Sequence, residues 1–183
     1  MVNNEKGINI RDLTKAAFLS AMSIVLTRFL YFMVPLAGLP TLRLSFGELP
    51  LMMNGLLFGP LIGGIGGVAA DLIGVLINPM GAYHPGFTIS SMLWGVIPGL
   101  FSFVFKRNET YEKIYSTKNI ALSVFVSYII VSLTLNTIWL SSMYSKGVMA
   151  FLPGRIISAI VSIPLQTIII KSLLKYLKGF IKA

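Results

Sequence analysis

The sequence predicts an all-α membrane protein with six transmembrane helices, both termini in the cytoplasm, and short, glycine-linked second and third helices. Hydrophobic residues make up 55% of the 183 residues and charged residues only 11%, whereas a soluble domain carries roughly 25% charged residues. Long apolar runs recur between residues 13 and 177, and the basic residues are distributed unevenly among the segments that separate these runs. We therefore expect residues 1–183 to form a single integral membrane domain.

Five windows are long enough to cross a bilayer, because a membrane helix needs about 20 apolar residues to span roughly 30 Å of hydrocarbon. They comprise residues 13–35, 51–77, 87–105, 120–143 and 151–174. The second window contains a glycine-rich run from Gly63 to Gly67, preceded by Gly59-Pro60. It is therefore either one long tilted helix or two short helices joined by a glycine turn.

The distribution of lysine and arginine separates these two alternatives, because basic residues near helix ends favour the cytoplasmic side. Six spans place eleven basic residues inside and two, Arg43 and Lys146, outside, whereas the better five-span orientation gives nine inside and four outside. We therefore expect six spans. The formal net charge of +9 then reflects membrane topology, not binding of nucleic acid. The outer connections at residues 36–50 and 78–86 are expected to form a lid or a pocket wall.

The sequence offers little for catalysis. It contains one histidine, no cysteine and six acidic residues, and four of these acids lie in the expected cytoplasmic segments: Glu5, Asp12, Glu109 and Glu112. Neither a Walker A sequence nor a metalloprotease or nucleophile-elbow motif is present. We expect no enzymatic activity, no metal site and no cofactor, and a transporter of this kind must obtain its energy from a partner.

Polar and aromatic residues gather at one depth, in the outer third of the expected bundle. A charge at membrane depth is costly and is a functional hypothesis by default. Aromatic rings stack on flat ligands and guanidinium groups bind carboxylates in a bidentate manner, so this set suits a ligand that is flat at one end and anionic at the other. The candidate ligand-binding residues are Arg28, Arg43, Phe46, Tyr83, His84, Phe87, Trp94, Asn136, Trp139 and Arg155.

Each candidate also has a structural interpretation. Arg28 and Arg155 either extend toward the outer surface or pair with Glu48. The two tryptophans and Tyr83 suit an interfacial aromatic belt, and Asn136 suits a hydrogen bond between helices. His84, beside a proline, suits a structural or stacking role better than metal ligation.

Small residues recur at four-residue spacing in two places, a pattern that lets helices approach closely. In the first span, Ala17 and Ala21 form a small-residue face that either packs internally or contacts a partner helix. Asp71 follows the expected glycine turn by four or five residues, so we expect it in the inner half as a packing or capping group and not as a substrate contact. The other small-residue ladder comprises Gly55, Gly59, Gly63 and Gly67.

Several segments resemble the substrate-binding S components of energy-coupling factor (ECF) vitamin transporters, and within them the folate-specific branch. The resemblance covers residues 14–175. The segments that carry it are Ala17-x-x-x-Ala21, LRLSFG at 42–47, AADLIG at 69–74, PMGAYHPGFT at 79–88, LNTIWL at 135–140 and LPGR at 152–155.

The resemblance implies six helices around an outward-facing pocket of high affinity in a bacterial cell membrane. It implies folate as the transported ligand, no catalysis by this chain, and assembly with a membrane T component and two ATP-binding cassette ATPase subunits. Ala17 and Ala21 would face the T component. Transport in this family is thought to involve toppling of the S component within the membrane, powered by the ATPases.

Two alternatives stay open on the sequence alone. One is an S component for another anionic or aromatic vitamin, such as pantothenate or a flavin. The other is a membrane enzyme or a non-transport membrane assembly protein, although an enzyme should show paired inward-facing carboxylates or histidines.

Overall fold

The computed structural model describes residues 10–36, 39–79, 81–105 and 111–181, and it is predominantly helical. Residues Thr117–Tyr144 form one long helical segment without a break. The predicted helical fold class is confirmed, with one small β-hairpin added to it. In chain order the elements are α1 (Ile10–Arg28), β1 (Tyr31–Leu36), β2 (Leu39–Ser45), α2 (Glu48–Phe58), α3 (Pro60–Ile77), α4 (Pro85–Phe105), α5 (Tyr111–Ile114), α6 (Thr117–Ser127), the π-helix η1 (Tyr128–Leu135), α7 (Asn136–Tyr144), the 3₁₀ turn η2 (Val148–Ala150) and α8 (Leu152–Ile181).

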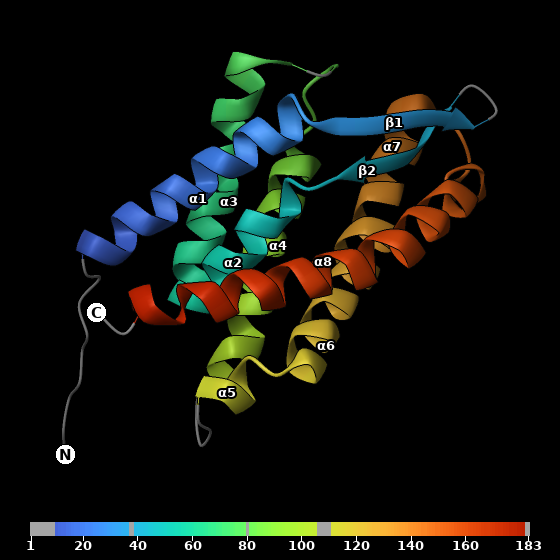
Figure 1. Cartoon of the computed structure of the whole chain (residues 1–183). Coiled ribbons are helices and arrows are strands. Elements are labelled where there is room, and N and C mark those ends of the chain that lie inside the picture. The colour runs from blue at the N-terminus through green and yellow to red at the C-terminus, as the bar shows by residue number, and fades with distance from the viewer. Residues whose placement is uncertain (1–9, 37–38, 80, 106–110, 182–183) are drawn as a thin grey trace.

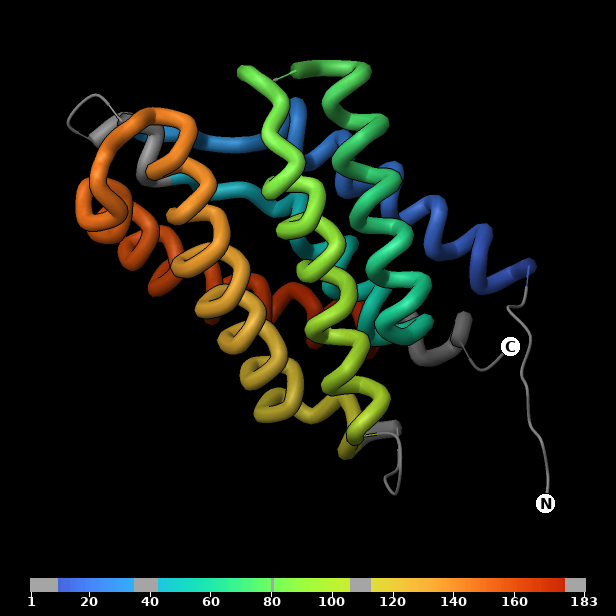
Figure 2. The backbone as a smooth tube through the Cα atoms, turned by 180° about the vertical axis from the view of Figure 1, so that it is seen from behind, coloured from blue at the N-terminus to red at the C-terminus, as the bar shows by residue number. Residues whose placement is uncertain are grey.

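The helices alternate in direction, so their connections gather at two opposite ends of the molecule (Figure 1). The β-hairpin, the α3–α4 connection and the α7–α8 connection lie at one end, which we call the hairpin end. The start of α1 and the end of α8 lie at the other end. Seen from behind, α3, α4 and the α6–α7 segment run side by side (Figure 2), and α4 packs against both α3 and α6.

Four helices among the described residues are long and apolar enough to cross a membrane: Pro60–Ile77, Pro85–Phe105, Thr117–Tyr144 and Leu152–Tyr176. Large apolar side chains are exposed along them, as at Leu61, Ile65 and Leu76 of α3, which is the pattern of a lipid-facing surface. The chain is thus a multi-pass membrane protein. The count of six spans and the cytoplasmic position of both termini stay predictions, and four of the basic residues behind them, Lys6, Lys106, Arg107 and Lys182, lie outside the described residues.

The first span is shorter in the structure than the sequence predicts. We expected a helix through residue 35, but α1 ends at Arg28, and residues 31–45 form the antiparallel β1–β2 hairpin. Aromatic and β-branched side chains favour strand at this point, and Pro35 disfavours helix for the residue before it. Met33 pairs with Arg43 in the hairpin register, and both side chains reach the cavity described below.

The turn between α2 and α3 lies at Gly59-Pro60, not in the glycine run at residues 63–67 as we expected. Gly59 has a φ of 92°, in the left-handed region that favours glycine after a helix end, and Pro60 begins α3 at the position that tolerates proline best. As a result α2 has 11 residues and α3 has 18. Asp71 therefore lies far from the turn, toward the hairpin end, which corrects its expected place in the inner half.

The glycine ladder brings three helices into close contact. A Cβ atom added to Gly55 would lie 2.0 Å from the carbonyl oxygen of Gly95, and one added to Gly67 would lie 2.1 Å from that of Ser91. A Cβ atom added to Gly63 would lie 2.7 Å from the Cα atom of Gly55. The predicted close packing is confirmed at these positions, whereas Gly59 serves the turn instead.

The short helix α2 forms the centre of the core. Every residue from 49 to 56 is buried, although 11 residues span only about 16 Å at 1.5 Å per residue. Asn54 is fully buried, and its Nδ2 donates to the Ala16 carbonyl at 3.1 Å and to Ser20 Oγ at 3.0 Å. These bonds fix α2 against α1 and so fix the position of Glu48, the first residue of α2.

Candidate ligand pocket

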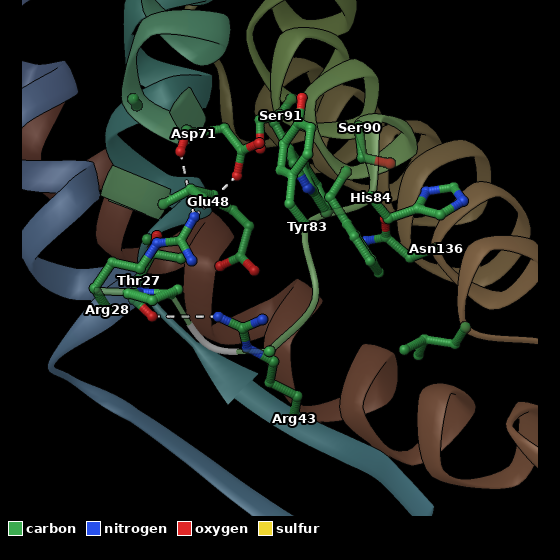
Figure 3. Close-up of a pocket in the computed structure, with 18 of the residues that line it drawn as sticks. Thr27, Arg28, Arg43, Glu48, Asp71, Tyr83, His84, Ser90, Ser91 and Asn136 are labelled. Atoms are coloured by element: carbon green, nitrogen blue, oxygen red, sulfur yellow. Dashed lines mark hydrogen bonds and ion pairs between the residues drawn. The ribbon is translucent and has the colours of Figure 1, made fainter. Parts of the chain in front are cut away.

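A cavity of about 270 Å³ lies at the hairpin end, where the first or last turns of most helices meet. Its walls come from α1, both strands, α2, α3, α4, α7 and α8, together with the connection between α3 and α4. Charged and polar groups from several elements converge on this space in Figure 3. A concave site with a few converging polar groups among apolar and aromatic walls is the usual form of a small-molecule pocket.

Eight of the ten candidate residues line this cavity, although they are spread over more than 120 positions of the chain. Phe46 and Trp139 do not line it. Phe46 packs against the hydrophobic core, while Trp139 lies behind His84, with the ring centroids 5.4 Å apart. The eight lining residues are Arg28, Arg43, Tyr83, His84, Phe87, Trp94, Asn136 and Arg155.

Arg28 pairs with Asp71, at 3.1 Å between Nη2 and Oδ1, and the two side chains are only 9% and 10% exposed. Arg28 also donates to the backbone carbonyl of Asn78 at 3.4 Å, and the Asn78 side chain donates back to the Arg28 carbonyl at 3.2 Å. Gly74 makes room for this pair, because a Cβ atom there would lie 2.7 Å from Arg28 Nε. The alternative in which Arg28 pairs with Glu48 is wrong, because the position of the α2–α3 turn brings Asp71 beside Arg28.

Asp71 also contacts the wall beside it. Its second oxygen, Oδ2, accepts a hydrogen bond from Thr88 Oγ1 at 2.7 Å, and the Thr88 hydroxyl lies 3.0 Å from the Tyr83 hydroxyl. The chain of groups from Arg28 through Asp71 and Thr88 to Tyr83 therefore links α1, α3 and α4 along one side of the cavity. Asp71 lines the pocket, contrary to its expected role as a packing group away from the site.

Arg43, Glu48 and Arg155 form a second charged cluster at the cavity. Arg43 donates to the Thr27 carbonyl at 3.2 Å (Figure 3) and lies over the Tyr31 ring at 5.3 Å. Glu48 is close enough to both arginines to interact with them electrostatically. Arg155 is 9% exposed, and its Nε and Glu48 Oε2 are buried atoms without a hydrogen-bond partner in the described part of the chain.

The aromatic residues form the floor and one wall. Trp94 is buried, and its ring meets Tyr128 edge to face, with centroids 5.0 Å apart. His84 lies between Phe87 and Trp139 and accepts a hydrogen bond on Nδ1 from the Gly86 amide at 3.1 Å. Trp139 Nε1 donates to Ser90 Oγ at 3.3 Å. Trp139 therefore supports the wall from behind.

The π-helix η1 places Asn136 at the cavity. The hydroxyl groups of Thr134 and Thr137 each donate to the carbonyl five residues earlier, at 2.9 and 3.2 Å, which is the spacing of a π-helical turn. Asn136, Leu140 and Met143 then follow at helical spacing and line the cavity. The buried Oδ1 of Asn136 has no hydrogen-bond partner among the described residues.

Sequence reasoning missed the roles of Asp71 and Glu48 in the pocket. The signal for Asp71 was the Gly59-Pro60 dipeptide, which marks a helix end followed by a helix start more strongly than a run of glycines does. Glu48 was considered only as a partner for arginine. The remaining polar residues of the wall, Ser23, Thr27, Ser90 and Ser91, carry no distinguishing pattern in the sequence. Within the described residues, no group of three or more His, Asp or Glu side chains is arranged to hold a metal ion.

Comparison with known proteins gives consistent results. The sequence model of a family described as "ECF-type riboflavin transporter, S component" matches residues 7–175. The folate transporter FolT of Clostridium novyi is 38% identical over 154 residues, which cover 84% of this chain and 82% of the relative. The folate transporter FolT of Leuconostoc mesenteroides is 28% identical over 164 residues, covering 87% of this chain and 82% of that relative.

A solved structure described as FolT bound with folic acid has the same fold. It superposes with a TM-score of 0.76 at 27% identity, covering 92% of this chain and 95% of that one. The match of the family model over most of the chain and the identity to the clostridial relative lead to one conclusion: the chain belongs to the family of ECF transporter S components.

Proposed function

We propose that this chain captures folate at the extracellular face of a bacterial cell, as the S component of an ATP-driven ECF vitamin importer. The observation that carries the proposal is a pocket with three arginines and an aromatic wall, in a chain whose two relatives reported above are folate transporters. Folate combines a flat pterin, a benzoyl ring and two carboxylates. Its rings would stack on the aromatic wall, and its carboxylates would bind the arginines.

Other vitamins suit this pocket less well. The matching family model is described by riboflavin, but riboflavin carries a flat ring and a neutral sugar-alcohol tail. It offers no anion to a pocket in which three arginines outnumber the two carboxylates, Glu48 and Asp71. Pantothenate carries one carboxylate but no ring to stack on the aromatic wall. A membrane assembly protein without a ligand gives no reason for buried arginines around a cavity.

The eight candidate residues that line the cavity would have different roles in binding. Rings of the ligand would stack on His84, Phe87 and Trp94, while Arg43 and Arg155 would supply charge for the glutamate carboxylates. Asn136 would contact the edge of the pterin. Arg28, held by Asp71, would contribute charge from a fixed position, and Trp139 and Phe46 would support the wall without direct contact.

We place both termini in the cytoplasm and the hairpin end outside, with six spans in one membrane domain. The alternating direction of the helices puts residues 111–118, which include Lys113 and Lys118, at the end opposite the pocket (Figure 1). This arrangement agrees with the preference of basic residues for the cytoplasmic side. The ligand would then enter from outside.

The proposed partners are a membrane T component and two ABC-type ATPase subunits, which would hydrolyse ATP while this chain performs no catalysis. Ala17 and Ala21 lie on an exposed face of α1, one helical turn apart. Small exposed side chains let a partner helix approach closely in a membrane, so we propose this face as the contact with the T component.

Replacing Ala21 with leucine is expected to prevent assembly while folic acid binding by the isolated chain stays unchanged. The added side chain would hold a partner helix away, but Ala21 is remote from the cavity lining. Co-purification of co-expressed T component and ATPases with the tagged chain measures assembly. The control is Ser172→Leu on the exposed surface of α8, and retained assembly of the Ala21 variant would contradict the assigned face.

Protein purified from folate-fed cells is expected to carry a bound pterin. Its absorbance spectrum and the mass of the molecule released on denaturation identify the ligand. A flavin spectrum from the same preparation would favour the riboflavin alternative and contradict the proposal.

A further inference from the structure

The buried polar atoms of pocket-lining residues that have no hydrogen-bond partner in the described structure include Glu48 Oε2, Asn136 Oδ1 and Arg155 Nε. Unpaired buried polar atoms cost free energy, and a native structure rarely keeps them without a reason. Two of the three are acceptors. An anionic ligand group cannot satisfy an acceptor, so arginine–carboxylate pairing does not account for them.

We infer that Glu48 is a specificity-determining residue that accepts hydrogen bonds from the donor edge of the ligand's pterin ring. This inference rests on the proposed folate function. The 2-amino-4-oxopyrimidine part of a pterin presents two neighbouring donors, the 2-amino group and N3–H, and a carboxylate offers only acceptors. Hydrogen bonds to an ionised acceptor are among the stronger ones in proteins.

The other pocket carboxylate is not available for this role. Both oxygens of Asp71 are occupied, Oδ1 by Arg28 at 3.1 Å and Oδ2 by Thr88 at 2.7 Å. Glu48 has Oε2 buried and without a partner. Figure 3 shows its carboxylate pointing into the space between the Arg28–Asp71 pair and Arg43.

Glu48 is also held rigidly, as a residue that reads a ligand should be. The segment before it is clamped, because Ser23 Oγ donates to the Gly47 carbonyl at 2.6 Å and the Gly47 amide donates to Ser45 Oγ at 3.1 Å. A Cβ atom on Gly47 would collide with Thr27, so the backbone approaches α1 closely here. The helix that follows is buried along residues 49–56.

A carboxylate in this position distinguishes ligands by the arrangement of the hydrogen-bond donors on their rings. A flavin ring presents one N–H between two carbonyl oxygens, and those oxygens would face the Glu48 carboxylate unfavourably. A pterin presents two adjacent donors to it. Glu48 would therefore favour folate over riboflavin, although members of the wider family model are described by riboflavin.

The test measures the dissociation constants of two ligands with each of two proteins, by calorimetry on the full chain. The ligands are folic acid and 2-desaminofolic acid, and the proteins are the wild type and Glu48→Gln. In the wild type, loss of the 2-amino group should weaken binding about ten- to a hundredfold. In Glu48→Gln the two ligands should differ clearly less than in the wild type, because the amide keeps one neutral acceptor oxygen and replaces the other oxygen by a donating NH2 group.

The matched control is Asp12→Asn at the far end of α1, which should behave as the wild type does. Saturable binding of 2-desaminofolic acid to Glu48→Gln would show that the variant is folded. An equal ratio of the two dissociation constants in both proteins would overturn the inference while the folate function stands. Failure of the wild type to bind folic acid at all would overturn the proposed function itself.

Discussion

Replacing Arg155 with methionine is expected to weaken folic acid binding by roughly 30- to 4000-fold. Arg155 is buried, and its Nε faces no hydrogen-bond acceptor among the described residues, so the bound ligand should supply one. Truncating one partner of a buried, hydrogen-bonded charge pair costs about 2–5 kcal/mol, and 1.4 kcal/mol corresponds to a factor of ten in affinity. Calorimetric titration of the purified variant gives the dissociation constant.

Two further variants show whether the effect belongs to the guanidinium group. Arg155→Lys keeps the charge but loses the planar pair of donors, so its affinity should fall between those of the wild type and Arg155→Met. Lys146→Met removes a basic residue that is exposed and does not line the cavity, and it should bind as the wild type does. Unchanged affinity of Arg155→Met would remove Arg155 from the site.

Replacing Arg28 with methionine is expected to destabilise the folded protein by about 3–5 kcal/mol, because it leaves the Asp71 carboxylate buried without its cation. The double variant Arg28→Met with Asp71→Leu should recover most of that loss, since replacing both members of a buried ion pair by apolar residues is often neutral. Thermal unfolding in detergent measures the change.

The control for this pair is Lys118→Met, which removes an exposed basic residue at the start of α6 and should unfold at the wild-type temperature. A single Arg28 variant as stable as the wild type would show that the ion pair does not hold α1 against α3. A double variant no more stable than the single one would show that the loss comes from packing and not from the unpaired charge.

Hydrophobicity and sequence motifs predict much of this molecule. Apolar run lengths locate the long helices to within a few residues, except that α1 ends at Arg28 and not at the expected residue 35, and α8 continues to Ile181, beyond the expected residue 174. The expected common depth of Arg28, Asn136 and Arg155 follows from counting residues from helix ends, and all three reach one cavity. Depth is predictable because each helix rises by a fixed amount per residue.

The errors arise where a local preference competes with another. The glycine run at residues 63–67 looked like a turn, but glycine also permits close helix contact, and the proline at position 60 fixes the helix start. That single shift moved Asp71 from the inner half to the pocket beside Arg28. Trp139 does not line the cavity, because Asn136, Leu140 and Met143 are the residues of α7 that face it, while the Trp139 ring lies against His84.

Titration of the purified chain in lipid nanodiscs with folic acid, riboflavin and pantothenate tests the central claim most directly. We predict saturable one-to-one binding of folic acid, with riboflavin and pantothenate each weaker by at least about a hundredfold, a difference of roughly 2.7 kcal/mol. Riboflavin binding as tightly as folic acid, or no measurable binding of folic acid, would contradict the account.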